Sequence, residues 1–265
     1  MSRKARLLKI QRLVVKVGTS LLTRQEGRLD QERMARFARE LSDIRKCGVQ
    51  VVLVSSGAIA AGMGELAWKK RPTDLAKKQA AAAVGQPRLM DDYRYFFRQE
   101  KQLIAQILLT KEDFDNRDRL RNIQATFETL LESNVIPVVN ENDSVAVDEI
   151  RVGDNDSLAA LVAAHIQADL LVLLTDVDGL MTRPPRQGEG ELIHRVTDVT
   201  PAIEALAHSA PGSDGGTGGM LTKIRAAKYA SRHNVAMVIA SGQKPGVLPA
   251  LVKGQTVGTL FLRAR

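Results

Sequence analysis

The stretch VQVVLV, residues 49–54, is almost wholly apolar and rich in β-branched side chains. A strand with water on one face alternates apolar and polar residues, so an unbroken apolar run predicts a strand that is buried on both faces. Residues 13–17 (LVVKV) and 170–175 (LLVLLT) have the same character. Strands of this kind are typical of a parallel sheet that helices cover on either side.

Longer segments with apolar side chains at helical spacing separate these runs. Asp30 is a candidate N-cap for one of them, which extends to residue 46. Pro137 counts against a central place for the strand at 135–139, because proline cannot donate a ladder hydrogen bond. Helices are further predicted over 56–66, 74–99 (interrupted at residues 85–87), 119–133, 156–167 and 219–233, strands over 103–109, 135–139 and 235–239, and a small hairpin over 145–152.

This alternation predicts one continuous α/β domain, a three-layer αβα sandwich with a mostly parallel central sheet. The 265 residues include one cysteine, Cys47, so no internal disulfide forms and a reducing, cytoplasmic location is expected. No run of about 18 apolar residues predicts a membrane span. The net charge is +8, but the basic residues are spread out and aromatic residues make up 4% of the chain, so no nucleic-acid partner is expected.

Ligands of open α/β sheets bind beyond the carboxyl ends of the strands. Small, donating or charged residues follow most of the predicted strands here, and a glycine-rich stretch precedes the last helix. These segments are KVGTS (16–20), SSGA (55–58), NEND (140–143), GDND (153–156), TDVDG (175–179) and GGTGGMLTK (215–223). Together they predict a cleft for an anionic ligand.

Most of these residues also have a plain structural interpretation. Gly18 fits an ordinary strand–loop turn, and the small residues from Gly57 onward fit helix–sheet packing as well as an anion-binding helix start. Asp156 suits the N-cap position of the next helix, and Asp143 suits a surface turn. Each residue alone therefore leaves the choice between a structural and a functional role open.

Two features favour function more strongly. Lys16 interrupts an apolar run at its carboxyl end, where a buried charge is costly unless an anion accompanies it. Residues 215–223 do not match the P-loop pattern, yet glycine N–H groups that lead into a helix suit a phosphate. The four histidines show no metal-ligand spacing with each other or with Cys47, so no protein metal site is expected. No serine-hydrolase elbow occurs either.

The motifs VVKVGTS, VSSGAIAAG, NENDSV, VGDNDSL, LLTDVDGL and GTGGMLTK, in this order, resemble those of the amino-acid kinase family. Of these motifs, VSSGAIAAG, NENDSV and VGDNDSL resemble most closely those of the members that phosphorylate glutamate. The resemblance implies an amino-acid kinase domain over residues 9–262, after a basic extension of residues 1–8 and without the C-terminal PUA domain of many members. It also implies ATP-dependent phosphorylation of the γ-carboxylate of L-glutamate, the first step of proline biosynthesis.

The resemblance further implies Mg²⁺, feedback inhibition by proline and a homo-oligomer, either a dimer or a tetramer. The labile acyl phosphate product makes glutamate-5-semialdehyde dehydrogenase the expected partner. Two alternatives stay open. A related kinase would share the outer motifs and phosphorylate another acceptor. A catalytically inactive binding protein with the same fold would have lost Lys16, Asp156 or Lys223, and all three are present.

The family's roles carry over onto matching positions. Lys16 and Lys223 correspond to the phosphate-handling lysines and Asp156 to the carboxylate that holds both. Ser56, Asp143 and Asn155 correspond to the glutamate-binding residues. The nucleotide-binding positions implied are Lys16, Gly18, Thr175, Asp176, Thr217, Gly218, Gly219, Met220, Leu221, Thr222 and Lys223.

Overall fold

The computed structural model describes residues 10–24, 28–146, 155–183, 190–208 and 219–264. All the strands among these residues join one sheet, in the order β3-β4-β2-β1-β5-β7-β8-β6. The pairs from β3 to β7 are parallel, and β8 runs antiparallel to β7. The strands are β1 (Arg12–Val17), β2 (Gln50–Ser55), β3 (Ile104–Leu109), β4 (Ile136–Glu141), β5 (Leu170–Thr175), β6 (Arg195–Val196), β7 (Ala236–Ser241) and β8 (Thr259–Phe261).

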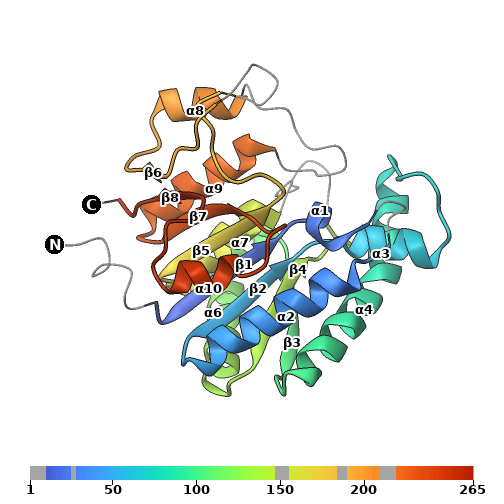
Figure 1. Ribbon diagram of the computed structural model, residues 1–265. Coiled ribbons are helices and arrows are strands. Elements are labelled where there is room, and N and C mark those ends of the chain that lie inside the picture. The colour runs from blue at the N-terminus through green and yellow to red at the C-terminus, as the bar shows by residue number, and fades with distance from the viewer. Residues whose placement is uncertain (1–9, 25–27, 147–154, 184–189, 209–218, 265) are drawn as a thin grey trace.

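Helices cover both faces of this sheet (Figure 1), which confirms the predicted three-layer α/β architecture. One face carries α1 (Thr19–Leu22), α2 (Gln31–Lys46), α3 (Ala58–Glu65), α4 (Leu75–Gln99) and α10 (Val247–Val252). The other carries α5 (Lys111–Asp115), α6 (Arg117–Glu132), α7 (Asn155–His165), α8 (Pro201–His208) and α9 (Met220–Arg232). None of the helices in the described ranges has the length and apolarity needed to cross a membrane.

The alternation of side chains along β1 directs its one charged residue. Leu13, Val15 and Val17 pack into the core on the α2 side, and Val14 packs into the core on the α7 side. Because successive strand residues point to opposite faces, Lys16 faces the α7 side with Val14. The sequence position of Lys16 therefore sets which helices it can contact.

The strand that contains Pro137 does lie inside the sheet, between β3 and β2, contrary to the expectation for proline. Its backbone explains how this is tolerated. Ile136 donates its N–H to Leu103 on the β3 side, so the nitrogen of Pro137 points toward β2. Pairing with β2 begins only at Val138, which lies opposite Leu53. The missing donor of Pro137 therefore falls outside that ladder.

The predicted interruption of the helix at residues 85–87 is wrong, because α4 continues through Pro87 to Gln99. Burial on both sides of the proline holds the helix together, and Gly85 itself is buried where α4 crosses α3. A Cβ atom at Gly85 would lie 1.9 Å from the carbonyl oxygen of Ala58 and 2.2 Å from the nitrogen of Gly62. The glycine thus permits a close helix crossing rather than ending a helix.

The other predicted helices and strands are confirmed, with ends shifted by a few residues, except the hairpin at 145–152, most of which lies outside the described residues. The short elements α1, α5, α8, α10, β6 and β8 were not predicted. Asp30 caps α2 as expected, since its side chain accepts a hydrogen bond from the Arg33 N–H.

We predict that Gly85→Ala destabilises the protein although alanine is the better helix former. The helix-propensity gain is about 1 kcal/mol, whereas the clash with two backbone atoms should lower the free energy of unfolding by about 3 kcal/mol. Gly18→Ala is the matched control, because its new Cβ would meet nothing closer than 3.7 Å. Urea unfolding of both variants measures the difference, and equal stabilities would contradict the crossing argument.

Candidate active site

The described polar residues at the ends of β4, β2, β1 and β5 do meet at one edge of the sheet. The strands β4, β2, β1 and β5 are consecutive in the sheet and parallel, so their carboxyl ends lie side by side. In the register, Val17 lies opposite Ser55 on one side and Leu174 on the other. The residues that follow β1, β2 and β5 therefore border one region.

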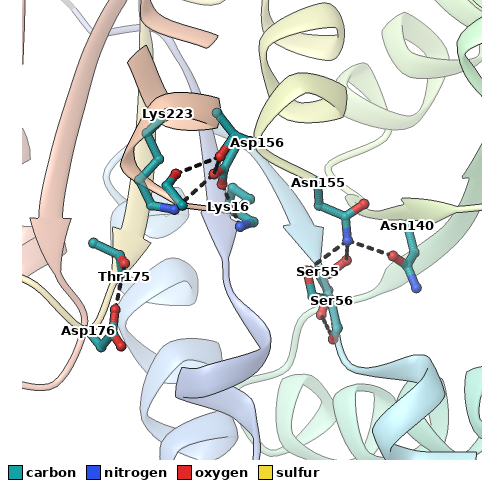
Figure 2. Close-up of polar contacts among 11 residues, drawn as sticks. Lys16, Ser55, Ser56, Asn140, Asn155, Asp156, Thr175, Asp176 and Lys223 are labelled. Carbon is teal, nitrogen blue, oxygen red and sulfur yellow. Dashed lines mark hydrogen bonds and ion pairs between the residues drawn. The ribbon is translucent and has the colours of Figure 1, made fainter. Parts of the chain in front are cut away.

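Two lysines and one aspartate form the charged centre of this region (Figure 2). Asp156, in the first turn of α7, has no solvent exposure. Its Oδ1 atom lies 2.5 Å from Lys16 Nζ, and its Oδ2 atom lies 2.9 Å from Lys223 Nζ. Both lysines are also buried, at 6% exposure each. The predicted bridging role of Asp156 thus has a direct geometric counterpart.

The electrostatics of Asp156 follow from these contacts. Burial alone would raise the pKa of its carboxyl, but the charges of Lys16 and Lys223 outweigh burial and hold the pKa below its usual range. Asp156 is therefore ionised at neutral pH. The three groups together keep one net positive charge in a place that water reaches poorly, which is favourable for an anionic ligand.

Thr222 completes the surroundings of the carboxylate. Its hydroxyl lies 3.1 Å from Asp156 Oδ2 and 2.7 Å from the carbonyl oxygen of Gly219, and its single proton can serve one of them at a time. Gly219 is the N-cap of α9 and offers no side-chain cap. The first N–H groups of α9 therefore receive no hydrogen bond from an N-cap side chain.

Asn155, the neighbour of Asp156, organises a second polar group in the opposite direction (Figure 2). Its Nδ2 atom lies 2.8 Å from the carbonyl oxygen of Ser55, 2.8 Å from Ser56 Oγ and 2.9 Å from Asn140 Oδ1. Its Oδ1 atom is buried and has no hydrogen-bond partner among the described residues. A buried acceptor without a donor is costly, so this atom is suited to a ligand that donates.

The remaining predicted residues are placed less tightly. Thr175 ends β5, and its hydroxyl donates to Asp176 Oδ1 over 3.0 Å, while its carbonyl oxygen accepts the Gly242 N–H. Gly18 follows β1 as the N-cap of α1. In Figure 2 the lysine–aspartate group lies between the Thr175–Asp176 pair and the Asn155 group, in agreement with the strand order.

Met220, Leu221, Thr222 and Lys223 form the first turn of α9, so the predicted lysine does lie one turn into a helix. Asp143 lies in the turn that follows β4. Thr217 and Gly218 lie outside the described residues, and their predicted contact with a nucleotide stays a prediction.

Ser55 and Asn140 have a predicted place at strand ends but no predicted role, and Gln86 and Tyr93 of α4 are not among the residues predicted from the sequence. Gln86 Oε1 accepts from Asn140 Nδ2 over 2.8 Å, and Tyr93 Oη lies 2.8 Å from Ser55 Oγ. The alternation along β2 and β4, which turns Ser55 and Asn140 toward α4, was the one available signal.

With this geometry in place, comparison with known proteins defines the class. The model of the amino acid kinase family matches residues 11–241, and the chain belongs to that family. The fold is also that of a UMP kinase from Bacillus anthracis, with a TM-score of 0.65 over 96% of each chain at 14% identity.

Relatives in sequence are more specific. A protein of Moorella thermoacetica named glutamate 5-kinase is 52% identical and aligns with 97% of this chain and 68% of its own length. A glutamate 5-kinase of Clostridium acetobutylicum is 45% identical, and the alignment covers 98% of both chains. The resemblance inferred from the motifs is therefore confirmed over nearly the whole sequence.

We predict that Asp156→Asn strongly destabilises the protein, because it leaves two buried ammonium groups without their anion. Losing one partner of a buried ion pair should lower the free energy of unfolding by about 3–5 kcal/mol. Asp43→Asn, which removes an exposed carboxylate 3.3 Å from Lys46, is the control, and its effect should stay below about 1 kcal/mol. Denaturant unfolding at neutral pH compares the two variants.

The same ion pairs predict a pH dependence. The pKa of Asp156 is lower in the folded protein than in the unfolded chain, so its contribution to stability is fully present above the unfolded value of about 3.9 and is lost as the pH falls further. The stability gap between the wild type and Asp156→Asn should therefore narrow below about pH 4. A gap that stays constant from neutral to acidic pH would contradict the ionised state of Asp156.

Proposed function

We propose that this chain transfers the γ-phosphoryl group of ATP to the γ-carboxylate of L-glutamate. The observation that carries the proposal is the pair of buried lysines joined by Asp156, one residue away from an amide group suited to a polar acceptor. Sequence relatives that bear the name glutamate 5-kinase support the choice of acceptor.

The residues suit a reaction that needs no general base. A carboxylate acceptor is ionised at neutral pH, since its reference pKa is about 4.3. The difficulty is the approach of two anions, so positioning and charge stabilisation account for most of the catalysis. Asp156 is ill suited as a base, because it is ionised and engaged by both lysines. It acts instead by holding Lys16 and Lys223 in place.

The space beside Lys16 supports a phosphate at this position. A Cβ atom at Gly18 would lie 3.7 Å from Lys16 Nζ without any closer contact to a described residue, and Gly18 has an ordinary φ of −75°. The fold itself therefore does not require glycine here, whereas an anion next to the ammonium group would. Lys16, Lys223 and the first N–H groups of α9 would hold the phosphates, with Thr175 and Asp176 on the nucleoside side.

Mg²⁺ fits the same picture as a companion of the nucleotide. No three His, Cys, Asp or Glu side chains gather within the described ranges. Mg²⁺ commonly keeps several waters and binds through substrate phosphates with one or two carboxylates, so it needs no such cluster. When bound, it would supply further positive charge to the phosphates.

On the acceptor side, Ser56 and Asn155 would bind L-glutamate, and Asp143 would pair with its ammonium group. The unpartnered Oδ1 atom of Asn155 supports a donor in the ligand. We further propose that residues 9–262 act as one kinase domain in a cytoplasmic homo-oligomer at the start of proline biosynthesis, with proline as inhibitor and glutamate-5-semialdehyde dehydrogenase as the enzyme that takes up the labile product.

The direct test measures ADP release with Mg²⁺ and ATP against L-glutamate, N-acetyl-L-glutamate, L-aspartate and UMP. We expect turnover with L-glutamate, suppressed by added proline. Turnover with one of the other acceptors alone would keep the phosphate half of the site and overturn the proposed acceptor.

Lys223→Ala should abolish most of the turnover while the protein stays folded. Removal of one charge that stabilises the transferred phosphoryl group should lower kcat by about 100- to 1,000-fold, whereas Asp156 keeps its contact with Lys16. Lys228→Ala, five residues further along α9 in a surface ion pair with Glu204, is the control. A near-normal kcat in Lys223→Ala would remove Lys223 from the proposed catalytic residues.

Gly18→Ala should raise the KM for ATP and leave the KM for the acceptor unchanged, because the added methyl group occupies the space beside Lys16 Nζ. The two Michaelis constants, measured separately, check this. An unchanged KM for ATP would show that no phosphate group uses this space.

A further inference from the structure

We propose that Gln86 and Tyr93 of α4 are positioning residues for the acceptor substrate: they hold the side-chain amide of Asn155 in a single orientation. This inference rests on the function proposed above, because it names residues that act on the acceptor half of the same site. Neither residue belongs to the charged group around Asp156.

The orientation of Asn155 is decided by two atoms that can only accept. Its Nδ2 atom lies near the carbonyl oxygen of Ser55 and near Asn140 Oδ1. A flipped amide would set oxygen against oxygen at both places, so the nitrogen must point there and Oδ1 must be the unpartnered atom. Binding of a ligand that donates a hydrogen bond to Asn155 Oδ1 therefore depends on both contacts.

Gln86 fixes the side chain of Asn140. Asn140 Nδ2 donates to Gln86 Oε1 over 2.8 Å, while Asn140 Oδ1 accepts the N–H of Glu141 over 2.9 Å. Gln86 Nε2 donates in turn to Gln106 Oε1 on β3, over 3.3 Å. The amide of Gln86 therefore presents its oxygen to Asn140, and Asn140 presents its oxygen to Asn155.

Tyr93 fixes the position of Ser55. The hydroxyl of Ser55 donates to the carbonyl oxygen of Ser56 over 3.1 Å, so the phenol of Tyr93 donates to Ser55 Oγ. Burial raises the pKa of Tyr93, against a smaller opposite effect of the Ser55 contact, so the phenol keeps its proton. This bond ties the end of β2, whose carbonyl group receives Asn155 Nδ2, to α4.

One helix supplies both supports. Residues 86 and 93 are seven positions apart, which is close to two helical turns, so they lie on one face of α4. The same helix packs against α3 through Gly85 and Gly62. The helix α4 therefore positions the ends of β2 and β4 and the start of α3. If Gln86 and Tyr93 had a purely structural role, substituting them would disturb all three of these segments alike.

The test compares Gln86→Met, Gln86→Glu and Tyr93→Phe with the wild type, using the acceptor that the panel above identifies. Gln86→Met should raise the acceptor KM about five- to tenfold, since one positioning hydrogen bond is lost. The KM for ATP and kcat should stay within about twofold, as for an interaction made equally in the ground state and the transition state. Gln86→Glu keeps an oxygen for Asn140 and should restore most of the acceptor affinity, and Tyr93→Phe should raise the acceptor KM in the same way.

Gln124→Met is the matched control, because the Gln124 amide also joins its helix to another element, donating to the His165 carbonyl oxygen over 2.9 Å at the far end of α7. It should leave both Michaelis constants unchanged. The inference is overturned if Gln86→Met behaves like this control, or if the KM values for ATP and acceptor rise together.

A second readout needs no turnover at all. NMR of the ligand-free protein can follow hydrogen exchange of the Asn155 side-chain amide, assigned by its loss in Asn155→Ser. The exchange should be slow in the wild type and at least about tenfold faster in Gln86→Met, because a looser amide opens more often. Unchanged exchange would overturn the inference even in an active kinase, whereas the absence of glutamate turnover would overturn only the proposed acceptor.

Discussion

The contact of Asp156 with two buried lysines is the constraint on which this edge of the structure depends. Lys16 belongs to the central strand β1 and Lys223 to α9, and neither ammonium group is tolerable at this depth without an anion. Asp156 supplies that anion from the first turn of α7. The contact therefore fixes α7 and α9 relative to the sheet, and the same three side chains create the positive charge that phosphates require.

The first turn of α7 also divides the site into two halves. Asp156 turns toward the lysines, and Asn155 turns toward Ser56 and Asn140, so consecutive residues contact the proposed phosphate half and the proposed acceptor half. The supports of the two halves are distinct, since α9 on one face of the sheet carries Lys223 and α4 on the other face supports Asn140. A fold arranged this way can keep its phosphate chemistry while the acceptor half changes.

Much of this could be predicted from the sequence because the strongest signals are local. Unbroken apolar runs revealed the buried strands, and the lysine in one of them revealed the charged centre. Partners that depend on packing were not accessible. The predicted break at residues 85–87 came from a local rule for glycine and proline, whereas a helix crossing decides that segment. Because of this error, Gln86 was not predicted as a residue that contacts the site. The short elements α5, α8 and α10 carry too few turns for a periodic pattern, and tertiary contacts stabilise them instead.

The order of the three charged residues along the chain bears on how the protein is made. Asp156 meets Lys16 across 140 residues and Lys223 across a further 67. Synthesis runs from the N-terminus, and contacts so distant in sequence form after the local ones. A nascent chain that ends before residue 223 already holds Ser56 and Asn155 but has only one of the two lysines. The buried centre with both lysines therefore assembles late in translation, after residue 223 has been added to the chain.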